Sequence, residues 1–233
     1  MTDPSTRERG ALHQVADDVW QLPLAPRQAL NVYLVGDVLL DAGTTRHAPV
    51  ILNALQNRLL RAHLITHAHI DHAGSSREIV RSRRIPMWVP AMDADAVEAG
   101  RAVVAKTPLR PLFGLLSRFP SVAVSRRMQE GDEVAAGFRV VDVPGHSPGH
   151  IALWREDDGV LICGDVLSNL KMPSLRPGLG LPPPVVTPDP HANRAAAVKL
   201  AALRPQLTLF GHGPAMYGAD ELSAFVAEAM RTG

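Results

Sequence analysis

The sequence has a single cysteine, Cys163, among its 233 residues. An internal disulfide is therefore excluded, and we expect this thiol to be buried as a small apolar side chain. Aromatic residues make up only 4% of the chain, which is too few for a stacking platform along single-stranded nucleic acid. Lysine and arginine (24) nearly balance aspartate and glutamate (23), so the net charge provides no general attraction to nucleic acid or to an anionic membrane.

Long apolar runs are also missing, since none approaches the roughly 18 residues of a membrane span. Residues 1–10 are polar and do not resemble a signal peptide. We therefore expect a cytoplasmic protein with a small-molecule partner and with neither nucleic acid nor membrane as a partner. The apolar content of 46% supports a substantial core. We expect a disordered lead over residues 1–12 and a single domain over residues 13–233.

Apolar periodicity predicts an alternation of strands and helices. Spacings of three and four residues predict a helix over 48–60, and short apolar runs between turns predict strands, among them 122–124 and 133–134. Both halves of the chain run from strands to helices, which predicts two packed β-sheets with helices outside. The other expected helices cover residues 76–84, 91–99, 190–203 and 218–230.

Two segments have no clear periodicity. Residues 100–120 belong to a stretch with basic but no acidic side chains, which predicts a surface insertion, either a solvated face or a lid or subunit contact. The second alternative leaves a homodimer open. Residues 171–190 contain seven prolines and are expected to form a loop, in which 173–190 is a candidate wall for a neighbouring cleft.

The residues most indicative of function are at 67–72, which read His-Ala-His-Ile-Asp-His. A strand-like segment precedes them and a helix start follows, so they lie on a strand-to-helix loop. Because side chains alternate along an extended chain, His67 and His69 can point the same way, and a turn beyond them lets Asp71 and His72 face a second point nearby. Neutral imidazoles and carboxylates suit zinc, iron or manganese.

Three later segments place a further candidate ligand directly after an apolar run and a glycine: His146, Asp165 and His212. This recurrence indicates one shared cleft at a sheet edge. Seven protein donors are too many for one four-coordinate zinc with an open position. They suit two metals about 3.5–4 Å apart, with one carboxylate bridging and a shared water.

These motifs resemble those of the metallo-β-lactamase superfamily. The matching segments are His-x-His-x-Asp-His at 67–72, Pro-Gly-His-Ser-Pro-Gly-His at 144–150, Gly-Asp at 164–165, Gly-His at 211–212 and Leu-Asp-Ala-Gly at 40–43. The resemblance extends from about residue 15 to about residue 230. It implies an αββα sandwich, an α/β (α+β) fold of two mixed sheets with helices outside, and two divalent metal ions at one edge. Zinc is the favoured ion, with iron and manganese as alternatives.

The resemblance also implies a role for each candidate ligand. The first metal would be held by His67, His69 and His146, and the second by Asp71, His72 and His212, with Asp165 as the bridge.

Three residues gain further roles from the resemblance. Asp71 is the candidate catalytic group, which accepts or passes a proton if it contacts the shared water. Asp41 resembles a carboxylate that orients a ligand imidazole. His150 would either support the ligands from behind or contact the substrate.

The expected reaction is hydrolysis of an ester, lactone or thioester by a hydroxide shared between the two metals. A β-lactamase is less favoured, because such enzymes usually lack a bridging carboxylate like Asp165. Glyoxalase II enzymes share the ligand set but carry a longer C-terminal helical region than the roughly twenty residues that follow His212. The alternative from another class is a persulfide dioxygenase with one iron, for which His67, His146 and Asp165 would supply two imidazoles and a carboxylate.

Overall fold

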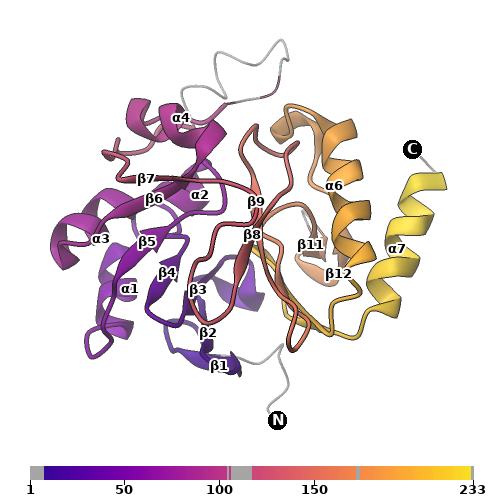
Figure 1. Ribbon diagram of the computed structural model, residues 1–233, viewed down its shortest axis with the longest axis horizontal. Helices are drawn as coiled ribbons and strands as arrows, with labels where there is room; N and C mark the ends of the chain where they lie inside the picture. Colours follow the sequence, from indigo (N-terminus) through magenta and orange to yellow (C-terminus); the bar gives the residue numbers. More distant parts are fainter. Residues whose placement is uncertain (1–7, 104, 106–116, 172–173, 232–233) are drawn as a thin grey trace.

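The computed structural model describes residues 8–103, 105, 117–171 and 174–231. Its elements form four layers, with helices on the outside and two β-sheets packed face to face between them (Figure 1). The predicted α/β sandwich of two mixed sheets is therefore confirmed. No helix in the described ranges is long and apolar enough to cross a membrane.

The first sheet contains seven strands in the order β1-β2-β3-β4-β5-β6-β7. Neighbours from β1 to β4 pair antiparallel, whereas those from β4 to β7 pair parallel. The inner parallel strands β4, β5 and β6 are short and fully buried because helices and the second sheet cover both of their faces, whereas the edge strand β7 has two exposed arginines. The seven strands are β1 (His13–Ala16), β2 (Val19–Pro23), β3 (Asn31–Val35), β4 (Val38–Leu40), β5 (Ala62–Leu64), β6 (Met87–Pro90) and β7 (Arg126–Met128).

The second sheet contains five strands in the order β14-β13-β10-β9-β8, and only β10 and β13 pair parallel. A separate two-stranded hairpin, β11 (Ser168–Lys171) and β12 (Arg176–Gly180), follows β10 along the chain. The five strands of the sheet are β8 (Arg139–Asp142), β9 (Ile151–Arg155), β10 (Val160–Ile162), β13 (Leu207–Leu209) and β14 (Met216–Tyr217).

Helices cover the outer face of each sheet (Figure 1). On the first sheet lie α1 (Ala48–Ala54), α3 (Ser76–Arg83) and α4 (Ala94–Ala99), and on the second α6 (Pro190–Ala202) and α7 (Asp220–Arg231). The start of α6 is specified locally, because Asp189 Oδ1 accepts a hydrogen bond from Ala192 N at 2.9 Å and a proline occupies the first helical position. The remaining short helices are α2 (Ile70–Ala73), η2 (Pro26–Gln28), η3 (Ala91–Asp93) and η4 (Pro184–Val186).

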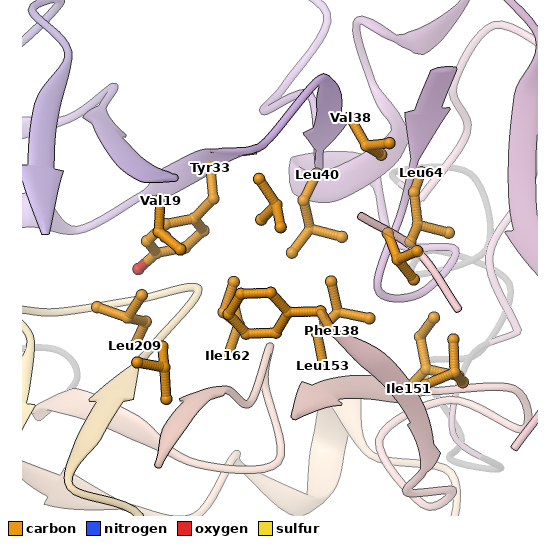
Figure 2. Close-up of a cluster of buried hydrophobic side chains, with 14 of the residues drawn as sticks. Val19, Tyr33, Val38, Leu40, Leu64, Phe138, Ile151, Leu153, Ile162 and Leu209 are labelled. Carbon is orange, nitrogen blue, oxygen red and sulfur yellow. The ribbon is translucent and has the colours of Figure 1, made fainter. Parts of the chain in front are cut away.

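The central core lies between the two sheets. Figure 2 shows Tyr33 and Leu40 of the first sheet facing Phe138, Leu153 and Ile162 on the second-sheet side. All five side chains are almost completely buried, so each removes most of its apolar surface from water. This shared core holds the two sheets together and so determines which strand ends lie side by side.

Three local predictions were wrong. Helix α1 ends at Ala54 instead of residue 60, and Leu59, which the helical spacing placed on the apolar face, is 84% exposed. Residues 122–124 are not a strand, because Val122 N donates to the carbonyl of Val97 at the end of α4. Residues 133–134 form no strand either, since Glu133 makes only an isolated bridge to Arg139.

The proline-rich segment is also more ordered than expected. Residues 171–190 were predicted to be a loop, but they contain β12 and η4. Pro177 is tolerated in β12 because a two-stranded ribbon leaves one edge of each strand unpaired.

Parts of two predicted segments fall outside the described residues. Residues 1–7 of the expected lead lie outside the described residues. Within residues 8–12, Gly10 N donates a hydrogen bond to the carbonyl of Pro23, so this part of the expected lead contacts the first sheet. Most of the expected insertion, residues 104 and 106–116, lies outside the described residues as well. Arg101 and Arg118, which are both described, form an isolated antiparallel bridge.

One buried histidine belongs to the core instead of the candidate site. His63 on β5 contacts the carbonyl of Leu39 through Nδ1 (3.0 Å) and the hydroxyl of Ser76 through Nε2 (2.8 Å), so it links β4 to α3. Burial lowers the pKa of His63 to about 4, although the carbonyl of Leu39 and the charge of Asp41 oppose this shift.

The lowered pKa of His63 predicts a loss of stability in acid. Between pH 6.5 and pH 4 the unfolded chain binds this proton and the folded chain does not, so the free energy of unfolding falls as pH decreases. The contribution is on the order of 3 kcal/mol, at about 1.4 kcal/mol per pKa unit. Urea unfolding of wild type and His63→Gln at both pH values measures it. The variant is expected to lose less stability on acidification, and equal losses would contradict the assignment.

Candidate metal centre

The candidate ligands lie on four loops at one end of the two sheets. Residues 67–72 leave β5 through Thr66 and enter the short helix α2, in which His69 occupies the N-cap position. His146 follows β8, Asp165 follows β10 and His212 follows β13. The structure brings all seven predicted residues together at this edge in two neighbouring clusters, and five of them line a shared cavity, whereas His67 and His72 are fully buried.

The first cluster contains three imidazoles. His69 Nδ1 lies 3.1 Å from His67 Nε2 and 3.0 Å from His146 Nε2. His67 and His146 are almost fully buried. Three ring nitrogens that converge at this distance have lone pairs directed at one small region, which is the arrangement that a metal ion requires.

The second cluster combines two carboxylates with two imidazoles. Asp165 Oδ2 lies 3.0 Å from His212 Nε2 and 3.3 Å from His72 Nε2, and Asp71 Oδ2 lies 3.4 Å from His212 Nε2. The same Asp165 oxygen is 3.6 Å from His146 Nε2 of the first cluster. Asp165 therefore lies between the two groups.

Burial and charge in the second cluster fit a bound cation. His72 Nε2 and Asp165 Oδ1 are buried, and neither has a hydrogen-bond partner among the described residues. Such orphaned atoms are costly unless something compensates them. Bound cations would compensate these buried groups, so the donor set fits a metal.

The pKa shifts in the second cluster reflect strong electrostatic interactions between its carboxylates and imidazoles. Burial alone would lower the pKa of His72, but the carboxylates of Asp165, Asp41 and Asp71 raise it well above its usual value. Burial would raise the pKa of Asp165, yet His212 and His72 hold it well below the usual range. A field that retains protons on buried imidazoles also favours divalent cations in their place.

In the first cluster the pKa values of the imidazoles are shifted in the opposite direction, downward. Burial, followed by the neighbouring imidazoles, lowers the pKa of His67 well below its usual value, and His146 is shifted the same way. The pKa of His69 is lowered mainly by burial, although Asp71 opposes the shift. These imidazoles are therefore neutral at pH 7, which is the form that binds a metal.

Each imidazole that faces the cleft with Nε2 has a partner on its other nitrogen. His72 Nδ1 contacts Asp41 Oδ2 at 2.9 Å, His146 Nδ1 contacts Thr187 Oγ1 at 3.2 Å, and His212 Nδ1 lies 2.6 Å from the carbonyl of Ala29. A donor proton on Nδ1 leaves the Nε2 lone pair free for the cleft. Sequence reasoning identified Asp41 but missed Thr187.

Asp41 and His150 support the ligands from behind. Asp41 adopts a left-handed backbone conformation (φ 64°) and accepts hydrogen bonds from Thr66 N (2.7 Å) and the Thr66 hydroxyl. His150 Nε2 accepts from Asp165 N at 3.0 Å, and burial lowers the pKa of His150 to about 3. The His150 ring is buried and is not among the described residues that line the cavity. Its position therefore fits the role of supporting the candidate ligands and not that of contacting a substrate.

Glycine is required next to one ligand because the loops approach closely. A Cβ at Gly211 would lie 2.2 Å from Asp165 Oδ1 and 2.9 Å from His72 Cε1, which real Cβ atoms essentially never show. Any side chain would therefore displace the carboxylate of Asp165.

Asp93 is a buried residue that sequence reasoning missed. It occupies the N-cap position of α4 without capping that helix. Its carboxylate accepts from Ala68 N (2.8 Å), Ser147 Oγ (2.6 Å) and Gly149 N (2.7 Å). It therefore links the loop of His67 and His69 to the loop of His146. An aspartate at a helix start ordinarily indicates a cap, so the sequence contained no signal for this role.

Removing the Asp93 carboxylate is expected to weaken the first cluster. Asp93→Ala would leave three buried donors unpaired, which lowers the free energy of unfolding by about 3 kcal/mol. It would also reduce metal affinity about 10- to 100-fold, because the two ligand loops lose their link. Urea unfolding and competition with a chromogenic chelator measure the two effects. Asp95→Ala, at an exposed carboxylate two residues away, is the control, and equal metal affinity in both variants would contradict the role of Asp93.

A cavity of about 430 Å³ opens on the second cluster. Asp71, Asp165 and His212 line it, together with His69 and His146 of the first cluster. The side chain of Asp71 is about one-third exposed, so the cluster is accessible to a small molecule.

Comparison with known proteins gives the family of this chain. The model of the metallo-β-lactamase superfamily matches residues 26–212, which include all seven candidate ligands. The chain belongs to the metallo-β-lactamase superfamily. The predicted resemblance is thereby confirmed.

The relatives differ in what their names state. The probable metallo-hydrolase YflN of Bacillus subtilis is 30% identical over 94% of this chain and 94% of its own length. A hydroxyacylglutathione hydrolase of Methylococcus capsulatus is 34% identical, but the match covers only 50% of this chain and 38% of that protein. The structure of TTHA1623 in a di-iron-bound form is 28% identical, with a TM-score of 0.63, and the match covers 91% of this chain and 98% of that one. The chain is therefore a member of a metallo-hydrolase superfamily, with residue clusters that suit divalent metals.

Proposed function

We propose that this chain is a hydrolase that holds two divalent metal ions and cleaves an ester, lactone or thioester. The observation that carries the proposal is the position of Asp165 Oδ2, within 3.0 to 3.6 Å of imidazole nitrogens from both clusters. A carboxylate oxygen that faces two ligand groups suits a bridge. When bound, two divalent cations lower the pKa of a shared water and polarise the substrate carbonyl.

The proposed ligand sets follow the two clusters. Each imidazole would supply one nitrogen, and the carboxylate between the clusters would be shared by the two metals. The first ion would be held by His67, His69 and His146, the second by Asp71, His72 and His212, with Asp165 shared.

Asp71 is the proposed proton carrier. Burial would raise its pKa, but His72 and His212 lower it, so the carboxylate is ionised at neutral pH. In hydrolysis, the oxygen of water adds to the acyl carbon and the bond from that carbon to oxygen or sulfur breaks. The carboxylate of Asp71 takes up the proton that water loses and passes it to the leaving oxygen or sulfur.

The relatives support this reaction class without naming the substrate. One is called a metallo-hydrolase and another a hydroxyacylglutathione hydrolase. Zinc is the ion we propose first, because imidazole and carboxylate donors with an open position suit it. The di-iron form of a relative makes iron the second candidate.

The first experiment measures metal content and turnover together. Protein prepared without chelator is expected to contain roughly two metal ions per chain by elemental analysis. Asp165→Ala is expected to lose at least one ion and to reduce turnover of esters and thioesters more than about 100-fold, because it removes the shared ligand. Asp157→Ala, at an exposed aspartate in the turn after β9, is the matched control and should change neither quantity.

Two results would contradict the proposal. If Asp165→Ala kept its metal and its turnover, the bridging assignment would be wrong. If the protein contained one iron per chain and consumed oxygen with a persulfide substrate, the dioxygenase alternative would replace hydrolysis.

A further inference from the structure

The cavity in front of the candidate ligands has two chemically different sides. One side carries the imidazoles and carboxylates of the two clusters. The other side is apolar. The whole cavity has a volume of about 430 Å³, which is within the range of small-molecule sites. The apolar side is formed by Leu170 and Leu175 of the β11–β12 region and by Pro182, Pro183, Val185 and Val186 of the following segment.

Contacts with the ligand loops place this apolar side relative to the clusters. The hydroxyl of Thr187 donates to the carbonyl of Pro183 at 2.9 Å and contacts His146 Nδ1 at 3.2 Å. On the other flank, Asn169 N donates to the carbonyl of His212 at 2.9 Å, and the Asn169 side chain donates to the carbonyl of Pro214. The same residues therefore position both the ligands and the apolar side.

Charge determines which substrates this side accepts. The described residues that line the cavity include no lysine or arginine. Arg27 and Arg176 line a separate groove on the far side of Leu175, where the guanidinium of Arg27 donates to the carbonyl of Leu175 at 3.3 Å. An anionic group against the apolar side would lose its hydration and meet no lysine or arginine among these residues, which is unfavourable.

We propose that the substrate carries an uncharged aliphatic acyl chain. This inference rests on the proposed hydrolase function and names the substrate class of the same site. The acyl chain packs against Leu170, Val185 and Val186, while the reacting carbonyl faces Asp71 and Asp165. Val185 and Val186 are each 38% exposed, so both have apolar surface that a bound chain would bury.

The first test is a series of neutral esters with straight acyl chains from acetyl to octanoyl, hydrolysed by the metal-loaded protein. The specificity constant kcat/KM is expected to rise about two- to fourfold for each added methylene until the cavity is full. An ester of the same length that ends in a carboxylate is expected to react more than about tenfold more slowly. A flat series, or preference for the terminal carboxylate, would overturn the inference while leaving the hydrolase function intact.

A series of binding measurements tests the apolar site independently of catalytic turnover. Straight-chain hydroxamates have a metal-binding head and an uncharged tail, and calorimetry measures their affinity without turnover. Affinity is expected to increase from acetohydroxamate to octanohydroxamate by a similar factor per methylene. If every ester remained intact but this increase were present, the hydrolase function would fail and the apolar site would stand. Equal affinities would overturn the site.

Variants locate the effect in the cavity. Val185→Asp is expected to abolish the dependence of hydroxamate affinity on chain length, and Val185→Thr, with nearly the same shape, is expected to reduce it. The control is Val198→Asp, at a valine of α6 that is 42% exposed and does not line the cavity. Elemental analysis of each variant shows whether the metals are retained. A chain-length dependence that persists unchanged in Val185→Thr and Val185→Asp would contradict the proposed position of the acyl chain.

Discussion

The carboxylate of Asp165 is the constraint on which the rest of the site depends. It is almost fully buried, and an unpaired negative charge there would be very costly. Imidazoles from three separate loops, His72, His146 and His212, lie within 3.6 Å of one of its oxygens. The partners on their Nδ1 atoms orient each ring toward this charge. The arrangement therefore prepares a site for cations, because compensation of the carboxylate and metal binding need the same donors.

Buried hydrogen bonds made by side chains maintain this geometry. Tyr33 and Asn31 of β3 both donate to the carbonyl of Phe210, at 2.7 and 3.1 Å, which connects the first sheet to the loop of His212. Asp93 performs the same task between the loops of His67 and His146. Each of these hydrogen bonds is buried, so water does not compete with it. They hold the loops at fixed positions relative to the packed sheets, and this sets the distances between candidate ligands.

Different sides of the cavity suit substrate binding and metal binding. Polar groups that suit metal binding occupy one side, and the hairpin β11–β12 with η4 supplies apolar surface on the other. Because Thr187 contacts both His146 and the carbonyl of Pro183, a change in the apolar segment is transmitted to a candidate ligand. Members of one superfamily can thus keep similar donors and differ in this segment, which is why the family alone does not name a substrate.

The sequence by itself determined the fold class and the chemical character of the site. Four metal-capable side chains within residues 67–72 and a glycine before each of three later ligands could be recognised, because a metal imposes donor types and short spacings on the chain. Periodicity identified the sheets and most helices for a similar reason, since burial of one face is a local property of the pattern.

Only the tertiary structure decided what surrounds those donors. Asp93 contacts residues 25, 54 and 56 positions away, and no local sequence pattern indicates such distant contacts. The prolines of residues 171–190 predicted a loop, yet β12 pairs with β11, and residues before and after β12 supply the apolar side of the cavity. The type of donor atom is a property of each residue and can be read from the sequence. The groups that contact a donor depend on which distant segments pack together, and this packing minimises the free energy of the whole chain.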